Sequence, residues 1–231
     1  MSWQAAPSYG PVHDAVYQRL RNQGRTGWDT TATYAEMLEI ARPILQGRAA
    51  SLGSPLRVIE LGCGAGELAL LFEAEGHQVT GVDASAVAVE WAREKAVAAN
   101  STSIFVHDDV TLLQDFPDAA FDVAVDAHCL HCIIGSDRMR ALRAVWRVLP
   151  PGGALVVMTM CGVITAPKVQ SALGPDGKTV LHDGVPVRYV SAPEEVLAEL
   201  DVSGFVVESH RVDPRESEQA QDMLIAVARR A

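Results

Sequence analysis

The sequence has no apolar run long enough to cross a membrane. A transmembrane helix needs about 18 or more mostly apolar residues in succession, and no stretch of the 231 residues meets that requirement. Residues 1–4 also lack the basic and apolar regions of a secretory signal peptide. We therefore expect a cytoplasmic protein without a membrane partner.

Basic residues are also scarce. The chain has 19 Lys and Arg against 29 Asp and Glu, which gives a formal net charge of −10 at pH 7. A surface that binds nucleic acid needs clustered Lys and Arg to neutralise phosphates. We expect no nucleic-acid partner and predict a small-molecule substrate, bound by a monomer or a homodimer.

Cysteine is too rare for a disulfide framework. The chain contains four cysteines, two of them spaced as Cys129-x-x-Cys132. Disulfide scaffolds are typical of small secreted domains, whereas so few cysteines in a chain of this size fit a reducing compartment. We therefore expect thiols.

Apolar residues make up 48% of the chain, and no break in composition marks a second full domain. From about residue 57, strand-like and helix-like segments alternate, which is the pattern of a doubly wound parallel sheet. A helix is expected at 136–149, and another opens with a capping box at Ser191 and Glu194 and stops at Gly204. Strands are expected at residues 57–61, 78–82, 103–107, 121–126, 154–160, 205–212 and 222–228, the last two as an antiparallel pair.

Residues 1–50 precede this alternation and contain two candidate helices, at about 12–21 and 30–45. In the second, apolar residues recur at helical spacing and Asp29 or Thr30 can cap the start. Pro43 indicates a kink or an early end. We expect this segment to pack as a helical lid on the domain formed by residues 51–231.

Three alternate glycines, Gly62, Gly64 and Gly66, follow the first expected strand. They allow a tight turn into the next helix and a close approach of backbone to a ligand. Their spacing differs from the Gly-x-Gly-x-x-Gly of dinucleotide-binding folds. With Glu60 before it and Asp83 about twenty residues later, the turn resembles the first motif of class I S-adenosylmethionine (SAM) dependent methyltransferases. The resemblance runs from about residue 57 to the C-terminus.

The resemblance implies an α/β fold, a doubly wound and mostly parallel sheet of seven strands in the order 3-2-1-4-5-7-6, and SAM as cofactor. The sequence pattern alone indicates only the number of strands and their alternation with helices. The Asn or Asp-Pro-Pro-aromatic motif that would favour RNA methylation is absent after the fourth strand. This absence, together with the acidic charge, favours a small-molecule acceptor.

Acids at the carboxyl ends of strands are the cofactor-binding candidates, since open α/β sheets bind ligands there. By resemblance, Asp83 accepts hydrogen bonds from both ribose hydroxyls and Ala84 lies beneath the adenine. The alternative is that Asp83 only caps the next helix. Asp109 and Val110 resemble the pair that holds the adenine through side chain and backbone. Asp108 is a rival for the role of Asp109.

Two further acids complete the cofactor-binding prediction. By resemblance, Asp126 stands where the family places a group near the methionine portion of SAM. Glu60 would brace the glycine turn or accept the SAM ammonium, and Gly62, Gly64 and Gly66 provide the backbone approach. Each signal is weak alone, because acids at strand ends also cap helices. Their occurrence in register favours a SAM site.

The segment after the fourth expected strand carries His128, Cys129, His131 and Cys132. His131 fits the Leu-His-His-Leu pattern common in the family, whereas many members have an apolar residue or Asn at the position of His128. A neutral imidazole can take a proton near pH 7, and it can also ligate zinc or iron. We predict that His128 or His131 acts as a base or binds substrate, with a metal site and core packing as the alternatives.

The insertion at about 162–190 reads as a hairpin or flap, with turn signals on either side of residues 178–181. In related enzymes this position lines the acceptor site; a solvated loop is the alternative. Trp28 and Tyr34 of the expected lid either close over the ligands or belong to the core. The substrate-binding candidates are Trp28, Tyr34, Cys161, His182, Arg188 and Tyr189.

These features predict an enzyme that transfers a methyl group from SAM to a small nucleophile by in-line displacement. Holding the nucleophile and methyl carbon collinear would lower the barrier, and a base is needed only if the acceptor must lose a proton. A nicotinamide-dependent oxidoreductase is disfavoured by the glycine spacing. A non-catalytic SAM-binding protein is the other alternative. The acceptor atom can be oxygen, nitrogen, sulfur, carbon or a metalloid.

Overall fold

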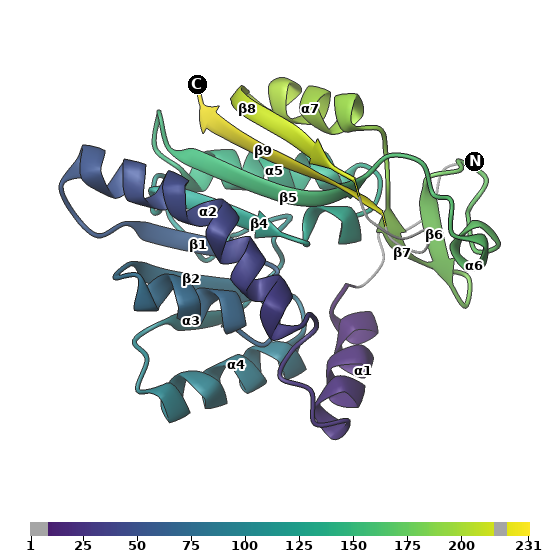
Figure 1. The fold of residues 1–231 in the computed structure, drawn as a ribbon, viewed down its shortest axis with the longest axis horizontal. Coiled ribbons are helices and arrows are strands. Elements are labelled where there is room, and N and C mark those ends of the chain that lie inside the picture. Colours follow the sequence, from purple (N-terminus) through teal and green to yellow (C-terminus); the bar gives the residue numbers. More distant parts are fainter. Residues whose placement is uncertain (1–8, 215–220) are drawn as a thin grey trace.

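The computed structural model describes residues 9–214 and 221–231. At its centre is a seven-stranded sheet in the order β3-β2-β1-β4-β5-β9-β8 (Figure 1). All the expected strands are present within two residues of the predicted bounds. The strands are β1 (Arg57–Leu61), β2 (Gln78–Asp83), β3 (Ile104–His107), β4 (Val123–Ala127), β5 (Ala154–Cys161), β8 (Phe205–Asp213) and β9 (Asp222–Arg230).

The first five strands are parallel neighbours, and β9 runs antiparallel to both β5 and β8. Counted within this sheet, β8 is the sixth strand along the chain and β9 is the seventh. The predicted α/β class and doubly wound arrangement are confirmed. A separate hairpin consists of β6 (Thr179–His182) and β7 (Val185–Tyr189).

Helices cover both faces of the sheet (Figure 1). This is why the central strands are apolar at nearly every position rather than at alternate ones. On β5, for example, Val156 packs on one face and Val157 on the other, and both are fully buried. The helices are α1 (Tyr9–Asn22), α2 (Thr31–Leu52), α3 (Glu67–Ala74), α4 (Ala86–Ala99), α5 (Asp137–Val148), α6 (Pro167–Gln170) and α7 (Pro193–Val202), with a 3₁₀ turn η1 (Leu130–Cys132).

Of the two outcomes predicted at Pro43, a kink or an early end of the second helix, the early end is wrong. Thr30 caps α2 as predicted, its side chain accepting from the Thr33 amide at 3.2 Å. The helix nevertheless continues past Pro43 to a left-handed Gly53. Proline removes one helical hydrogen bond, but the buried residues Met37, Leu38, Ala41 and Leu45 pack on both sides of it. Tertiary packing therefore outweighs the local signal.

The capping box of α7 was misplaced by one residue. Ala192 is the N-cap, and its amide donates to Glu195 Oε2 at 3.3 Å. Ser191 is extended instead, because its carbonyl accepts from Gly162 N at 2.9 Å and it bridges to Cys161 at the end of β5. None of the helices in the described ranges is both long and apolar enough to cross a membrane.

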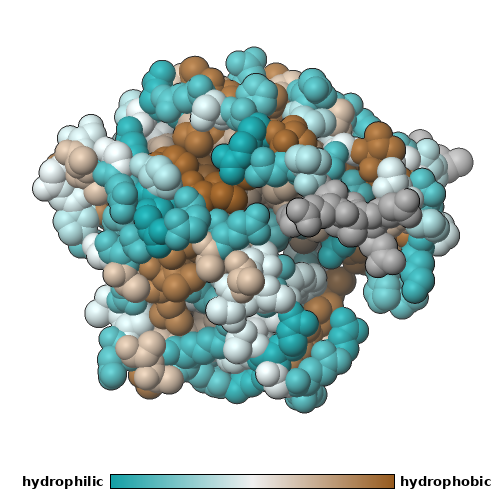
Figure 2. Space-filling view, in the orientation of Figure 1, coloured by the Kyte–Doolittle hydropathy of each residue, from teal (hydrophilic) through white to brown (hydrophobic). Residues whose placement is uncertain are grey.

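The two N-terminal helices have different surroundings. The apolar face of α2 belongs to the core on one side of the sheet, and Figure 2 shows apolar side chains gathered beside it among hydrophilic ones. In contrast, α1 packs on α4. Asp14 Oδ1 accepts from Ser85 Oγ at 2.6 Å and from Val87 N at 3.1 Å, and Arg21 pairs with Glu94 at 2.5 Å. Asp14 therefore ties α1 to the start of α4.

We expect Asp14→Ala to loosen α1 without unfolding the sheet. Loss of a side chain that accepts from a helix N-terminus costs about 1 kcal/mol. Hydrogen exchange should show faster exchange of the α1 amides and unchanged exchange of β4 and β5. Asp14→Asn retains an acceptor oxygen and serves as the control. Parent-like exchange of α1 in Asp14→Ala would show that another contact holds this helix.

Candidate active site

A cavity of about 370 Å³ lies at the carboxyl ends of β1, β2 and β4. Its walls include α1, the loop before α2, the start of α2, the glycine turn, η1 and the flap at 162–190. This volume is within the usual range for small-molecule sites. Most of the predicted site residues line the cavity, namely Trp28, Tyr34, Glu60, Gly62, Gly64, Asp83, Ala84, Asp109, Val110, His128, His131 and Arg188.

The glycine turn is in direct contact with the segment after β4. Gly62 has a φ of +64°, and a Cβ added there would lie 2.8 Å from Cys129 Cβ and Sγ. Both the left-handed backbone and the close approach therefore require glycine. Gly66 is the N-cap of α3 and faces Phe105 and Ala92 rather than the cavity.

Asp83 ties the glycine turn to the end of β2. Its Oδ2 accepts from Gly64 N and its Oδ1 from Ser85 N, both at 2.8 Å. Burial raises the pKa of Asp83, an effect that these two amides oppose. Each carboxylate oxygen can accept a second hydrogen bond, so Asp83 can still accept from a ligand.

Glu60 is a buried acid with an unused acceptor. Its side chain is nearly enclosed, and burial raises its pKa well above the usual range. Oε2 has no hydrogen-bond partner among the described residues. A buried oxygen of this kind is costly unless a ligand satisfies it.

Of the two rival acids after β3, Asp109 lines the cavity and Asp108 does not. Asp108 Oδ1 accepts from Asp109 N at 2.7 Å, and Asp109 Oδ1 accepts from Thr111 N at 2.8 Å. Asp108 thus holds the turn that presents Asp109 and Val110 to the cavity.

Asp126 does not line the cavity. Its Oδ1 accepts from Cys129 N at 2.8 Å and from Leu130 N at 2.9 Å, and burial raises its pKa to about 6. The carboxyl thus shapes the turn from β4 into η1. It does not face the cavity, where the sequence predicted that it lies near SAM.

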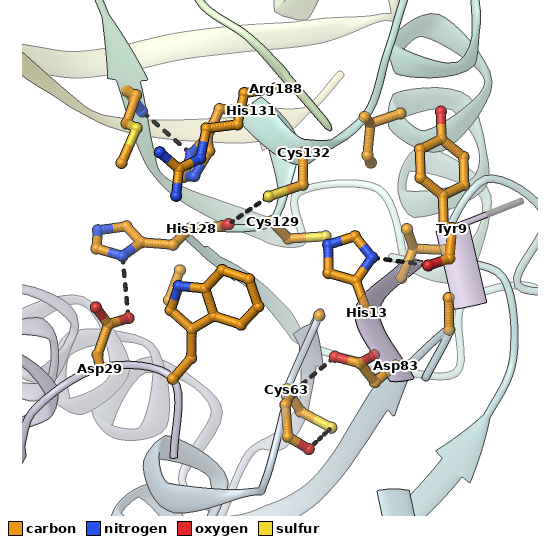
Figure 3. Close-up of a pocket in the computed structure, with 18 of the residues that line it drawn as sticks. Tyr9, His13, Asp29, Cys63, Asp83, His128, Cys129, His131, Cys132 and Arg188 are labelled. Atoms are coloured by element: carbon orange, nitrogen blue, oxygen red, sulfur yellow. Dashed lines mark hydrogen bonds and ion pairs between the residues drawn. The ribbon is translucent and has the colours of Figure 1, made fainter. Parts of the chain in front are cut away.

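His128 is held by Asp29 at the cavity wall (Figure 3). Its Nδ1 lies 3.3 Å from Asp29 Oδ2. A carboxylate can only accept, so this contact places a proton on Nδ1 and, in the neutral ring, a lone pair on Nε2. The backbone of His128 is left-handed, with a φ of +73°, which is uncommon for a residue other than glycine.

His131 is engaged differently. Its Nδ1 lies 3.3 Å from Met160 N and 3.4 Å from Thr159 Oγ1. Because a backbone amide can only donate, Nδ1 is the acceptor and carries no proton. His131 therefore connects η1 to β5, and this nitrogen is already occupied.

Three predicted substrate-binding residues lie outside the cavity. Cys161 is fully buried, and the His182 side chain is 77% exposed at the tip of the hairpin. The Tyr189 ring packs instead on Arg138, whose guanidinium carbon lies 5.1 Å from the ring centroid. Trp28 stands in an aromatic group, with its ring centroid 5.6 Å from that of Tyr17.

Sequence reasoning missed the contribution of α1. Tyr9, His13 and Tyr17 all line the cavity, and their spacing of four residues places them on one face of the helix. That spacing was the available signal. Asp29 was missed as the partner of His128 because the two residues are 99 positions apart.

The four cysteines are free thiols. Burial raises the pKa of Cys132 to about 12 and that of Cys129 well above the usual range. Within the ranges described, no three His, Cys, Asp or Glu side chains are grouped so that they could hold a metal ion.

Comparison with known proteins decides the family. Residues 59–157 match the family model described as "Methyltransferase domain". Residues 59–157 therefore form a methyltransferase domain, and the chain resembles class I SAM-dependent methyltransferases in sequence and fold. It is 37% identical over 107 residues to a demethylmenaquinone methyltransferase of Thermus thermophilus, a match that covers 46% of this chain and 47% of that protein. The chain thus spans about half the length of the curated relatives that it matches.

Two solved structures match over nearly the whole chain. One is 1,6-didemethyltoxoflavin-N1-methyltransferase of Burkholderia thailandensis, bound to 1,6-didemethyltoxoflavin and S-adenosylhomocysteine (SAH), with a TM-score of 0.71 and 25% identity over 100% of this chain and 93% of that one. The other is the [4+2]-cyclase SpnF, with a TM-score of 0.73 and 22% identity over 99% of both chains. The second match shows the fold alone.

Asp83→Ala should weaken SAM binding by about 1 to 3 kcal/mol, because the family resemblance predicts that Asp83 is the charged acceptor for two ribose hydroxyls. Calorimetric titration of SAM measures the change. Asp115→Ala is the control, since Asp115 is exposed and does not line the cavity. Equal affinity of parent and Asp83→Ala would contradict the proposed role of Asp83.

Asp126→Asn should make the protein more stable at neutral pH. A carboxyl whose folded pKa is raised to about 6 stabilises the fold fully below its unfolded value near 3.9, and that contribution is lost as the pH rises through about 6. The cost of ionising Asp126 at pH 7 is therefore about 2 to 3 kcal/mol. Asparagine retains the oxygen that accepts from Cys129 and Leu130 and carries no charge.

Urea unfolding at pH 4 and pH 7 tests this expectation. The gain from Asp126→Asn should be present at pH 7 and absent at pH 4. The exposed Asp115→Asn provides the matched control. A loss of stability at pH 7 that is absent at pH 4 would show that the carboxyl is needed in its ionised form and would contradict this expectation.

Proposed function

We propose that the protein transfers a methyl group from SAM to a small organic acceptor within this cavity. One observation carries the proposal. The same cavity is bordered by the glycine turn with Asp83 and Glu60, and by a His128–Asp29 pair. The first set fits a cofactor with hydroxyls and an ammonium, and the second provides a proton acceptor beside it.

The cofactor side of the cavity fits SAM on chemical grounds. Asp83 would accept from the ribose hydroxyls, and Asp109 and Val110 would flank the adenine. The unpartnered Oε2 of Glu60 would accept from the ammonium or from amides of the glycine turn. SAM supplies an electrophilic methyl group when bound. These assignments rest on the family resemblance together with the positions of the residues in the cavity.

His128 is the better candidate for the base. Asp29 holds the proton on Nδ1, which leaves Nε2 able to accept a proton from an acceptor hydroxyl, amine or thiol. His131 has its Nδ1 occupied by Met160 N and Thr159 Oγ1. We therefore assign to His131 the role of positioning η1 against β5.

The proposed lid is best assigned to α1 and the loop that follows it. Tyr9, His13 and Tyr17 of α1 and Trp28 of the loop border the cavity. The start of α2 also borders it, through Thr33, Tyr34 and Met37, but the apolar face of this helix packs in the core. Closure by these aromatic rings would exclude water from the site, which favours methyl transfer over loss of the methyl group to solvent. The acidic net charge of −10 supports a small-molecule acceptor over a nucleic acid.

Two measurements test the proposal. Calorimetric titration should show binding of SAM and SAH and no binding of a nicotinamide dinucleotide. Incubation of the protein and methyl-labelled SAM with fractionated metabolites should then give a labelled product. Because one protein of this fold is described as a [4+2]-cyclase, binding of SAM with no labelled product would favour a non-methylating role and contradict the proposal.

Asp29→Asn should reduce turnover more than it reduces SAM affinity. An amide can donate to Nδ1 of His128, which favours the tautomer with its proton on Nε2 and removes the base. With the acceptor found in the labelling screen, kcat should fall at least tenfold while SAM affinity changes less than twofold.

His128→Gln should show the same pattern, because glutamine cannot take the proton. Thr33→Val, a change at the cavity wall that leaves the His128–Asp29 pair intact, is the control. If both Asp29→Asn and His128→Gln turn over at the parent rate, the acceptor needs no base at this position.

A further inference from the structure

The charged groups around the cavity are unevenly distributed. Four carboxyl side chains line it, those of Asp29, Glu60, Asp83 and Asp109. Among the described residues, Arg188 is the only Lys or Arg that does so. A single cation in a cavity rich in carboxyls requires an explanation, and the carboxyls on the cofactor side do not provide one.

Beyond the backbone pairing of β7 with β6, the Arg188 side chain forms no hydrogen bond or ion pair with the described residues. The neighbouring cations differ in this respect. Lys178 of the same flap pairs with Glu195 at 2.6 Å, and Arg138 pairs with Glu199 at 2.7 Å. Arg188 is half-buried, so its guanidinium loses hydration without gaining a partner among residues 9–214 and 221–231. A bound anion would stabilise such an arrangement.

The position of Arg188 separates it from the cofactor-binding candidates. It projects from β7 beside His131 and Cys132, whereas Asp83 and the glycine turn at Cys63 lie on the other side of the cavity (Figure 3). Its charge also opposes the rise that burial causes in the pKa of Cys132.

The wall next to Arg188 is apolar. Ile164, Val180 and Val190 form a buried cluster, against which Met160 and Val169 pack. All five of these residues line the cavity. The flap therefore offers an apolar surface and one guanidinium, without any carboxyl of its own at the cavity.

We propose that the acceptor is an organic anion, with its apolar body against the flap cluster and a carboxylate or ionised hydroxyl on Arg188. The inference rests on the proposed function, since it names the class of molecule methylated at that site. A guanidinium presents paired N–H donors that match two oxygens of a carboxylate. The carboxyls on the cofactor side disfavour the reverse orientation of such an anion.

The test measures binding to the protein saturated with SAH, so that it does not depend on knowing the true acceptor. The probes are benzoate, cinnamate and 2-naphthoate, each compared with its own carboxamide. Ionised 4-nitrophenol is compared with 4-nitroanisole, which distinguishes the hydroxyl source of the anion from the carboxylate source. Calorimetry gives the affinity of each probe for the parent, Arg188→Gln and Arg188→Lys.

For at least one pair we expect the anion to bind the parent about tenfold or more tightly than its neutral partner. Arg188→Gln should abolish this preference, and Arg188→Lys should retain part of it, because an ammonium keeps the charge without the paired donors. The control is Lys168→Gln, which removes an exposed cation of the same flap outside the cavity and should behave as the parent. SAH affinity should be equal in all four proteins.

Three results would overturn the inference. The parent could show no preference for any anion, the preference could survive Arg188→Gln, or Arg188→Gln could weaken SAH itself. The last result would show that Arg188 holds the carboxylate of the cofactor. Failure of the parent to bind SAH is a distinct outcome, since it would contradict the proposed function as well.

Discussion

The contact between two turns organises this site. The glycine turn after β1 approaches the segment after β4 so closely that only glycine fits at position 62. Asp83 joins the same turn to the end of β2 through Gly64 N at 2.8 Å. The carboxyl ends of three parallel strands are thereby fixed around one cavity, as expected at the ligand-binding edge of an open α/β sheet.

The close packing of these turns also buries polar side chains that hydrogen-bond to the backbone. Asp126 orders the turn into η1 through two backbone amides, at the cost of a raised pKa. His131 links that turn to β5 through Met160 N. Because Asp126 and His131 hold the backbone, His128 and Arg188 are the residues at this end of the cavity to which we assign contacts with the acceptor.

The sheet and the glycine turn could be predicted from sequence because their signals are local. Buried parallel strands are short apolar runs, and Asp83 ends one of them. Other features depend on contacts that no local pattern specifies. Pro43 does not end α2, since packing on both sides sustains the helix, and Asp126 points into the turn rather than the cavity.

The cavity side chains that are distant in sequence were the hardest to predict. Asp29 meets His128 across 99 positions, and Arg188 reaches the cavity while the adjacent Tyr189 packs on Arg138. Adjacent residues of a strand point to opposite faces, so the position of the flap over the sheet decides which of the two faces the site. The position of the flap depends on tertiary packing, which no local sequence pattern specifies.

A crystal structure of the protein with SAH tests the central claim most directly. The ribose hydroxyls should lie within hydrogen-bonding distance of Asp83, the adenine beside Asp109 and Val110, and the homocysteine amine beside Glu60. The thioether sulfur should face the end of the cavity that holds His128 and Arg188. SAH bound elsewhere, or with its adenine against the flap, would contradict the assignment of this cavity as the methyl-transfer site.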